Sequence, residues 1–260
     1  PGVAGAGAGP RVQVRVMLLF VARSLAFPVL AAQASGGSAA AAQAGDEAPD
    51  RVLSDERRDS RWAYVEETVL ARARPNDRAA PVRRLTPWTG DDTPELVLLL
   101  EERTDARDRT WVRVRLPMRP ANRTGWVRRA RLGKDNRVAT KLVVDRRALR
   151  ATLYRDGRTV WTSPVGIGKP GWPTPPGRFY IRERLVPSDP TGIYGVLAFG
   201  TSAYAPYATD WPGGGVVGVH GTNQPELIPG RPSHGCIRVP NSRIRRLGQL
   251  MTLGTPLQIR

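Results

Sequence analysis

The stretch Ser233-His234-Gly235-Cys236-Ile237-Arg238, with His220-Gly221-Thr222 shortly before it, concentrates the reactive side chains of this chain in one window. The window holds the one cysteine and both histidines of the 260 residues. A cysteine reacts as its thiolate, which needs a neighbouring base or cation. If the window forms an extended strand, His234 and Cys236 project from the same face, because strand side chains alternate. The window is therefore the first candidate for an active site.

Two other interpretations of the window compete with nucleophilic catalysis. A lone cysteine can be a small buried hydrophobic residue. A metal could also take His220, His234 and Cys236 as three ligands, whereas a closed structural zinc site uses four. The spacing matches none of the common zinc patterns, so we expect nucleophilic catalysis and not metal binding. Gly235 leaves room for a substrate, and its backbone N–H could stabilise an oxyanion.

The charge of the chain points to a polyanionic environment. The formal net charge is +17, and the sequence pI is near 11.3. Such a chain suits nucleic acid, an anionic membrane face or anionic cell-wall polymers. No RNA-recognition sequence, zinc-finger spacing or helix-turn-helix pattern is present, so we do not expect nucleic acid as a partner.

The first sixty residues predict an export segment and a linker. Arg11 and Arg15 precede an apolar run, and Ala32-Gln33-Ala34 matches the small-x-small pattern of a signal-peptidase site, so we assign residues 1–34 to export. Residues 35–60 predict a linker without a core. Contact with a membrane is expected only through an uncleaved N-terminal segment, if at all.

Residues 61–135 predict a small β domain. Val112, Val114 and Leu116 alternate with Arg113 and Arg115, which is the pattern of a strand with one buried face. Several such short strands in about 70 residues suit a small barrel. The pattern Trp-Val-x-Val, a loop, then Thr-Gly-Trp-Val resembles bacterial SH3-like domains, which in cell-wall enzymes often accompany a catalytic domain. Wall binding and a purely structural spacer both remain open as its role.

Residues 136–260 predict a second, mostly β domain. Strand candidates include residues 140–145, 151–155, 158–165 and 216–219, with Asp156-Gly157 as a hairpin turn. One helix is expected near the end, capped by Asn241 or Ser242 and stopped at Gly254. Its apolar stripe consists of Ile244, Leu247, Leu250 and Met251.

The window and two further segments resemble the catalytic domain of the L,D-transpeptidases, the YkuD family. That family combines a His-Gly with Ser/Thr-His-Gly-Cys about a dozen residues later and Arg or Asn two residues after the cysteine. Thr174-Pro175-Pro176-Gly177-Arg178-Phe179 and Gly254-Thr255-Pro256-Leu257 resemble two other family segments. The resemblance covers roughly residues 138–260. It implies a mainly β fold: an SH3-like barrel followed by a β-sandwich with mixed sheets, one or two short helices and a groove under a lid.

The resemblance also implies a role for each residue of the site. Cys236 would be the acylated nucleophile and His234 its base. The Gly235 carbonyl or Ser233 would orient His234, and the N–H groups of Gly235 and Cys236 would form the oxyanion hole. The substrate-binding residues would be His220, Gly221, Arg238 and Tyr204. Tyr194, Tyr207 and Trp211 would lie, with Tyr204, near the lid.

The implied reaction is an acyl transfer on peptidoglycan stem peptides outside the cytoplasm. The thiol attacks the carbonyl of the third stem residue, D-Ala leaves, and an amine of a neighbouring stem takes the acyl group in a 3→3 cross-link. With water as acceptor the enzyme would be an L,D-carboxypeptidase. The resemblance also implies that neither an organic cofactor nor a metal is needed. A non-enzymatic wall-binding protein is the alternative from another class, and the intact Cys/His constellation argues against it.

Overall fold

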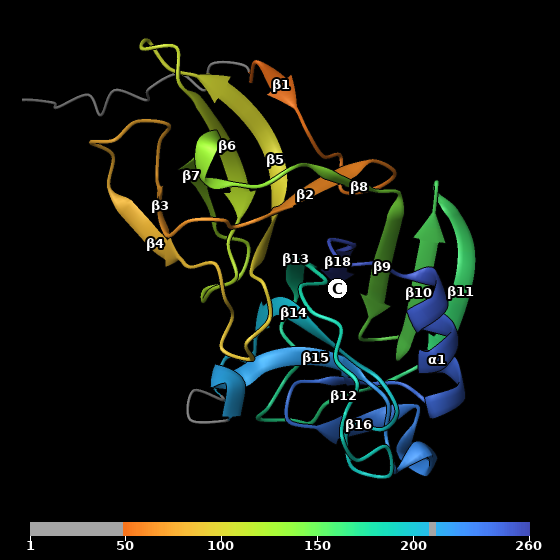
Figure 1. The fold of residues 1–260 in the computed structure, drawn as a ribbon. Helices are drawn as coiled ribbons and strands as arrows, with labels where there is room; N and C mark the ends of the chain where they lie inside the picture. The colour runs from red at the N-terminus through yellow and green to blue at the C-terminus, as the bar shows by residue number, and fades with distance from the viewer. Residues whose placement is uncertain (1–48, 208–211) are drawn as a thin grey trace, which may run out of the picture. The chain divides into compact units, whose positions relative to one another are not determined.

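The computed structural model describes residues 49–207 and 212–260 (Figure 1). These described residues group into one unit by their contacts. The export segment expected at residues 1–34 and most of the expected linker lie outside the described residues. Within the described part of the chain, no helix is long and apolar enough to cross a membrane.

The N-terminal half forms an eight-stranded sheet in the order β4-β3-β7-β6-β5-β2-β8, with β1 paired to β5. The SH3-like barrel stays a prediction. The strands of this sheet are β1 (Arg51–Val52), β2 (Ser60–Tyr64), β3 (Val69–Arg72), β4 (Pro81–Leu85), β5 (Leu96–Thr104), β6 (Thr110–Arg115), β7 (Thr124–Arg128) and β8 (Asn136–Val138), with the 3-10 turn η1 (Arg129–Arg131) before β8.

Both boundaries expected for this domain shift. β1 pairs with β5, and Leu53 is buried in the core, so the last ten residues of the expected linker are folded. β8 pairs with β2, so residues 136–138 belong to this sheet and not to the second domain. The sequence missed both because two- or three-residue strands carry too little alternation to be recognised.

The alternation expected in β6 is confirmed for its apolar face. Val112, Val114 and Leu116 are buried in one core cluster. The opposite face is covered as well, because Trp111 is 1% exposed and the Arg115 guanidinium is buried against Glu56. Burial of an arginine on a strand requires such a partner.

The C-terminal half is mainly β with mixed sheets, as expected. Two five-stranded sheets have the orders β11-β10-β9-β18-β13 and β14-β15-β17-β12-β16, and each contains parallel and antiparallel pairs. Their elements are β9 (Thr140–Asp145), β10 (Arg150–Arg155), β11 (Arg158–Pro164), β12 (Gly166–Gly168), β13 (Gly177–Tyr180), β14 (Ala198–Tyr204), β15 (Val216–His220), β16 (Gly230–Ser233), β17 (Ile237–Arg238) and β18 (Pro256–Ile259), with the 3-10 turns η2 (Pro212–Gly215) and η3 (Pro225–Leu227).

One α-helix is present in the described residues, α1 (Asn241–Leu250). Ile244 and Leu247 pack into the core as the expected stripe requires. The expected cap is wrong: Pro240 holds the cap position, and the Asn241 side chain accepts hydrogen bonds from the N–H groups of Val196 and Thr222. Asn241 therefore ties the helix start to the strand end that carries His220.

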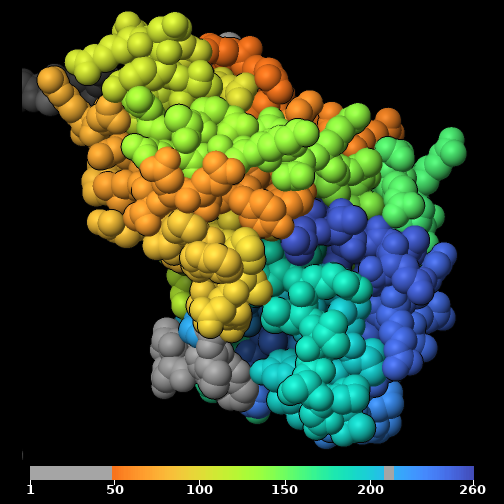
Figure 2. All heavy atoms as spheres, in the orientation of Figure 1, coloured from red at the N-terminus to blue at the C-terminus, as the bar shows by residue number. Residues whose placement is uncertain are grey.

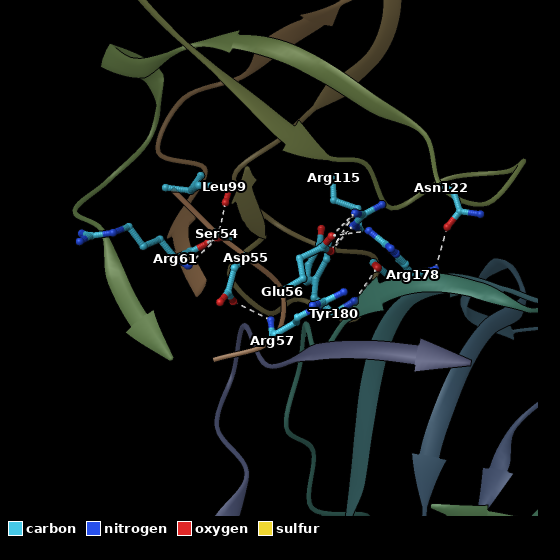
Figure 3. Close-up of polar contacts among 11 residues, drawn as sticks. Ser54, Asp55, Glu56, Arg57, Arg61, Leu99, Arg115, Asn122, Arg178 and Tyr180 are labelled. Carbon is cyan, nitrogen blue, oxygen red and sulfur yellow. Dashed lines mark hydrogen bonds and ion pairs between the residues drawn. The ribbon is translucent and has the colours of Figure 1, made fainter. Parts of the chain in front are cut away.

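Three contacts join the two halves: the buried Tyr180, an ion pair, and the carboxylate of Glu56, which contacts two arginines. Tyr180 is fully buried with Leu96 and Leu98 of β5, and its hydroxyl donates to the Leu96 carbonyl. Glu56 lies between Arg115 and Arg178 and contacts both guanidinium groups (Figure 3).

The ion pair of the junction joins Arg182 and Glu95. Arg182 donates two hydrogen bonds, of 2.7 and 2.6 Å, to the Glu95 carboxylate, and both side chains are almost completely buried. Burial alone would lower the pKa of Arg182, but the bonds to Glu95 raise it overall. The segment after β13 is thereby fixed against the N-terminal sheet.

Candidate active site

Cys236 opens into a pocket of about 470 Å³. β14, β15 and the segment after β13 line the pocket, and Asp91 from the β4–β5 loop belongs to its wall. Figure 2 shows the yellow β4–β5 loop bordering a hollow on this face, with the cyan segment after β13 on its other side. The pocket brings together six residues singled out from the sequence, namely Tyr194, His220, Ser233, His234, Cys236 and Arg238.

The Cys236 segment is a bend and not the expected strand. β16 ends at Ser233 and β17 begins at Ile237, and Gly235 between them has φ +124°. Such a φ favours glycine, because a Cβ would clash with the backbone. His234 and Cys236 therefore do not stand side by side on one strand face, and the i, i+2 argument for the pair fails.

Ser233 holds this bend closed. Its hydroxyl donates to the Cys236 carbonyl over 2.6 Å and accepts the Gly235 N–H over 3.1 Å. The Gly235 N–H is thus engaged inside the bend, which argues against its expected place in an oxyanion hole. The contacts of the Ser233 hydroxyl fix the nucleophile, whereas the sequence had suggested that it orients His234.

Thr174 was not expected at the site from the sequence, and its side chain supports the bend from the other side. Its buried hydroxyl donates to the Gly235 carbonyl over 2.8 Å and accepts the Gly168 N–H over 2.9 Å. The Gly235 carbonyl, which was expected to orient His234, accepts this hydrogen bond from Thr174. The sequence pointed to Thr174 only through the segment Thr174-Pro175-Pro176-Gly177, which resembles a family motif.

His220 is the buried histidine of the pocket. Its Nδ1 lies 2.6 Å from the Gly221 carbonyl, so Nδ1 carries the proton and Nε2 is left as an acceptor. The ring is 4% exposed, and it packs edge to face on Tyr194 at 5.1 Å. Burial lowers the pKa of His220 to about 4, with a further lowering by the Arg238 charge and an opposing effect of the Gly221 carbonyl. The imidazole is therefore neutral at pH 7.

The Cys236 thiol and the His220 ring both lie close to Gly218. The Gly218 N–H points to Cys236 Sγ at 3.4 Å, and a Cβ at Gly218 would lie 3.5 Å from His220 Cδ2 and 3.8 Å from Sγ. Burial raises the pKa of the Cys236 thiol, and the Gly218 N–H and the Arg238 charge only partly oppose this rise. The resting pair is thus a neutral thiol beside a neutral imidazole, and a base must take the proton as the thiol attacks.

His234 occupies a different environment. Its side chain is exposed and packs edge to face on Trp172, with 5.2 Å between ring centroids. Desolvation and the charges of Lys169 and Arg238 lower its pKa. His234 lines the mouth of the pocket, while His220 lies in its wall.

Arg238 supplies positive charge to the pocket. Its guanidinium donates to the Gln224 side chain over 2.9 Å, and its buried Nε has no hydrogen-bond partner among the described residues. No carboxylate pairs with Arg238 in the described part of the chain. Gly221 contributes its carbonyl to His220 and packs on Asn241, so it acts through the backbone.

The structure does not bring Tyr204 to Cys236. Tyr204 lines a second cavity of about 380 Å³ at the junction, where Arg119 lies over its ring and Arg182 contacts its hydroxyl. Tyr194 is the aromatic residue from the expected lid region that reaches the Cys236 pocket. Trp211 lies outside the described residues. Tyrosine spacing in a loop-rich segment cannot tell the two cavities apart.

A comparison with protein families matches residues 139–259 to the model of the YkuD L,D-transpeptidase catalytic domain. Two curated relatives carry the name L,D-transpeptidase YkuD. The protein of Bacillus subtilis is 34% identical over 42% of this chain and 58% of its own length, and that of Bacillus licheniformis is 35% identical over 41% and 57%. The chain thus spans less than two thirds of these relatives.

Solved structures of L,D-transpeptidases are also similar to this chain. The catalytic domain from E. faecium is 27% identical, with a TM-score of 0.35, over 46% of this chain and 96% of that domain. An enzyme of Mycobacterium smegmatis is 18% identical, with a TM-score of 0.37, over 64% of this chain and 90% of that chain. The family model and the curated relatives together support a YkuD L,D-transpeptidase catalytic domain at residues 139–259.

Proposed function

We propose that this protein is an exported L,D-transpeptidase that cross-links peptidoglycan stem peptides 3→3 through a thioester on Cys236. The observation that carries the proposal is the neutral thiol of Cys236 beside the oriented, neutral imidazole of His220 in one pocket. This arrangement suits acyl transfer, in which a base takes a proton from the nucleophile as it attacks.

In the acylation step, Cys236 Sγ attacks the carbonyl of the third stem residue while its proton passes to His220 Nε2. The tetrahedral intermediate collapses, the bond to D-Ala breaks, and the imidazolium returns the proton to the leaving amine. In the second step an acceptor amine attacks the thioester, a C–N bond replaces the C–S bond, and the amine proton returns to the thiolate by way of the same imidazole.

This proposal gives His220 the role that the sequence had assigned to His234. A general base needs a fixed tautomer and a lone pair aimed at the proton that it removes. The Gly221 carbonyl fixes the tautomer of His220, and the ring lies beside the thiol across Gly218. His234 is exposed on Trp172, so we assign it to the wall of the substrate entrance.

Arg238 is proposed to hold a substrate carboxylate, because its guanidinium faces the pocket without an acidic partner in the described residues. The Cys236 N–H is proposed as an oxyanion donor. Anionic wall polymers suit the positive charge of the whole chain, and an extracytoplasmic location follows from the substrate.

Intact-mass spectrometry with a carbapenem tests the chemistry. The wild type should gain one covalent adduct, and the Cys236→Ala variant none. An adduct that persists in Cys236→Ala would overturn the assignment of the nucleophile.

A matched pair of histidine variants tests the base. His220→Asn should slow acylation at least about 100-fold, as expected for loss of a general base. His234→Asn should change the rate by less than about tenfold. The reverse order of the two variants would restore His234 as the base.

A further inference from the structure

Glu183 is a buried carboxylate in the wall of the Cys236 pocket, and the proposed reaction does not yet use it. It is 3% exposed, and it lines both the Cys236 pocket and the junction cavity. Its Oε1 accepts a hydrogen bond from the Thr93 hydroxyl over 3.0 Å. No cation pairs with it among the residues that the structure describes, although the chain carries 40 Lys and Arg against 23 Asp and Glu.

The carboxylate of Glu95, in the same region, is paired with a cation. Arg182 precedes Glu183 in the sequence, and its guanidinium is engaged by Glu95. Arg182 is therefore not the counterion of Glu183. A buried carboxylate without a cation is costly, which favours a cationic ligand as its partner.

Two opposed glycines leave the path from Glu183 to Cys236 open. Gly200 of β14 and Gly218 of β15 pair directly across the strands. A Cβ at Gly200 would collide with Oε2 of Glu183, and a Cβ at Gly218 would lie 3.8 Å from Cys236 Sγ. Because directly opposed residues share a sheet face, the carboxylate and the thiol lie within roughly 12 Å of each other above this bare floor.

Positive and negative side chains lie on different walls of the pocket. Arg238 belongs to the wall that carries Cys236 and His220, and its charge lowers the pKa of both His220 and Cys236. Glu183 and Asp91 belong to the wall next to the N-terminal domain. A pocket with a cationic wall and an acidic wall favours a carboxylate at the first and an ammonium group at the second.

We propose that Glu183 binds the ammonium group of the acyl acceptor, which then gives one proton to solvent, so that the neutral primary amine moves along the Gly200–Gly218 floor and attacks the thioester. The inference rests on the proposed function, since it assumes a thioester on Cys236. It assigns the acceptor as an amine-bearing stem residue that enters from the side of the β4–β5 loop. Glu183 thereby favours transfer to an amine over hydrolysis.

The test separates acylation from acyl transfer in the full chain. Wild type and Glu183→Gln receive a tetrapeptide stem as donor, and the thioester is followed by intact mass. Its partition is then measured among water, a diamino-acid tripeptide and hydroxylamine, a nucleophile that is uncharged at neutral pH. Glu226→Gln, an exposed carboxylate on η3 outside the pocket lining, is the matched control.

Glu183→Gln should form the thioester within about twofold of the wild-type rate. Its aminolysis by the tripeptide should fall about tenfold relative to hydrolysis, as expected for loss of local electrostatic attraction. Its reaction with hydroxylamine should not change, and Glu226→Gln should match the wild type throughout.

Three results would overturn the inference. An unchanged ratio of aminolysis to hydrolysis would exclude Glu183 from acceptor binding. An equal loss with the tripeptide and with hydroxylamine would show a general defect of the site. A tenfold loss of thioester formation would place Glu183 in the first step. Failure of the wild type to form any thioester would instead refute the proposed function, and the inference with it.

Discussion

The junction and the Cys236 pocket differ in whether their ionisable groups are paired with an opposite charge. At the junction the charges are paired, because Arg182 donates two hydrogen bonds to the Glu95 carboxylate. Arg115 likewise donates two hydrogen bonds to the Glu56 carboxylate (Figure 3). In the pocket, His220 and Glu183 are buried and Cys236 is half-buried, and none of the three forms an ion pair within the described residues.

The difference separates structural groups from reactive groups. A buried ion pair fixes two segments against each other, and breaking it strands a charge. A buried group without a counterion keeps its neutral form or attracts a charged ligand, as the lowered pKa of His220 and the raised pKa of Cys236 show. The two regions share the segment Arg182-Glu183, in which one residue serves the junction and the next faces the pocket.

The largest expected difference in unfolding free energy comes from removing one carboxylate charge in each of the two regions. Glu95→Gln leaves Arg182 buried and unpaired, which should reduce the free energy of unfolding by about 3–5 kcal/mol. Glu183→Gln removes a carboxylate that has no cation, and it should change this free energy by less than about 1 kcal/mol. Urea unfolding of both variants checks the comparison. Equal losses would mean that Glu183 also belongs to the structural network.

Acid should lower the free energy of unfolding of the protein, because His220 is buried in its neutral form. Its pKa is lowered from 6.5 to about 4 in the folded chain, so the unfolded chain binds the proton more tightly. The stabilisation is complete above pH 6.5 and is lost as the pH falls towards 4, by about 3 kcal/mol. Between pH 7.5 and pH 4, the free energy of unfolding of His220→Asn should therefore fall by about 3 kcal/mol less than that of the wild type. Identical pH dependence of the two proteins would refute the buried, neutral state of His220.

Neutral hydrogen bonds support the nucleophile and should matter less than the paired charges. Thr174→Val leaves the Gly235 carbonyl and the Gly168 N–H unpaired, at a cost of about 1–3 kcal/mol in unfolding free energy. Acylation of Cys236 should slow as well, because the bend loses its support. Thr174→Ser should restore both, and the exposed Thr162→Val is the control. Full activity of Thr174→Val would show that Ser233 alone holds the bend.

The smallest effect is expected from Tyr204→Phe. The hydroxyl lies in the junction cavity, 3.5 Å from Arg182, and does not line the Cys236 pocket. Acylation by a carbapenem should stay within about twofold of the wild type, because less than about 0.5 kcal/mol is at stake at such a site. A tenfold loss would indicate that the two cavities act as one substrate site.

Much of the fold and the site could be predicted from local patterns. The alternation in β6, the stripe of α1 and the strands around Asp156-Gly157 all appear in the structure. The Cys/His window likewise pointed to the pocket. The two-residue β1 and the N-terminal assignment of the three-residue β8 were missed, because strands this short carry too little alternation to be recognised.

The sequence by itself determined which residues are chemically able to react, since one cysteine and two histidines leave few choices. Only the tertiary structure decided which histidine accompanies the thiol, because β15 and β17 pair in parallel and bring His220 beside the Cys236 bend. It also placed Glu183 on the pocket wall and Tyr204 in another cavity. Residue type fixes intrinsic reactivity, whereas pairing across strands fixes distance, burial and charge, on which the roles depend.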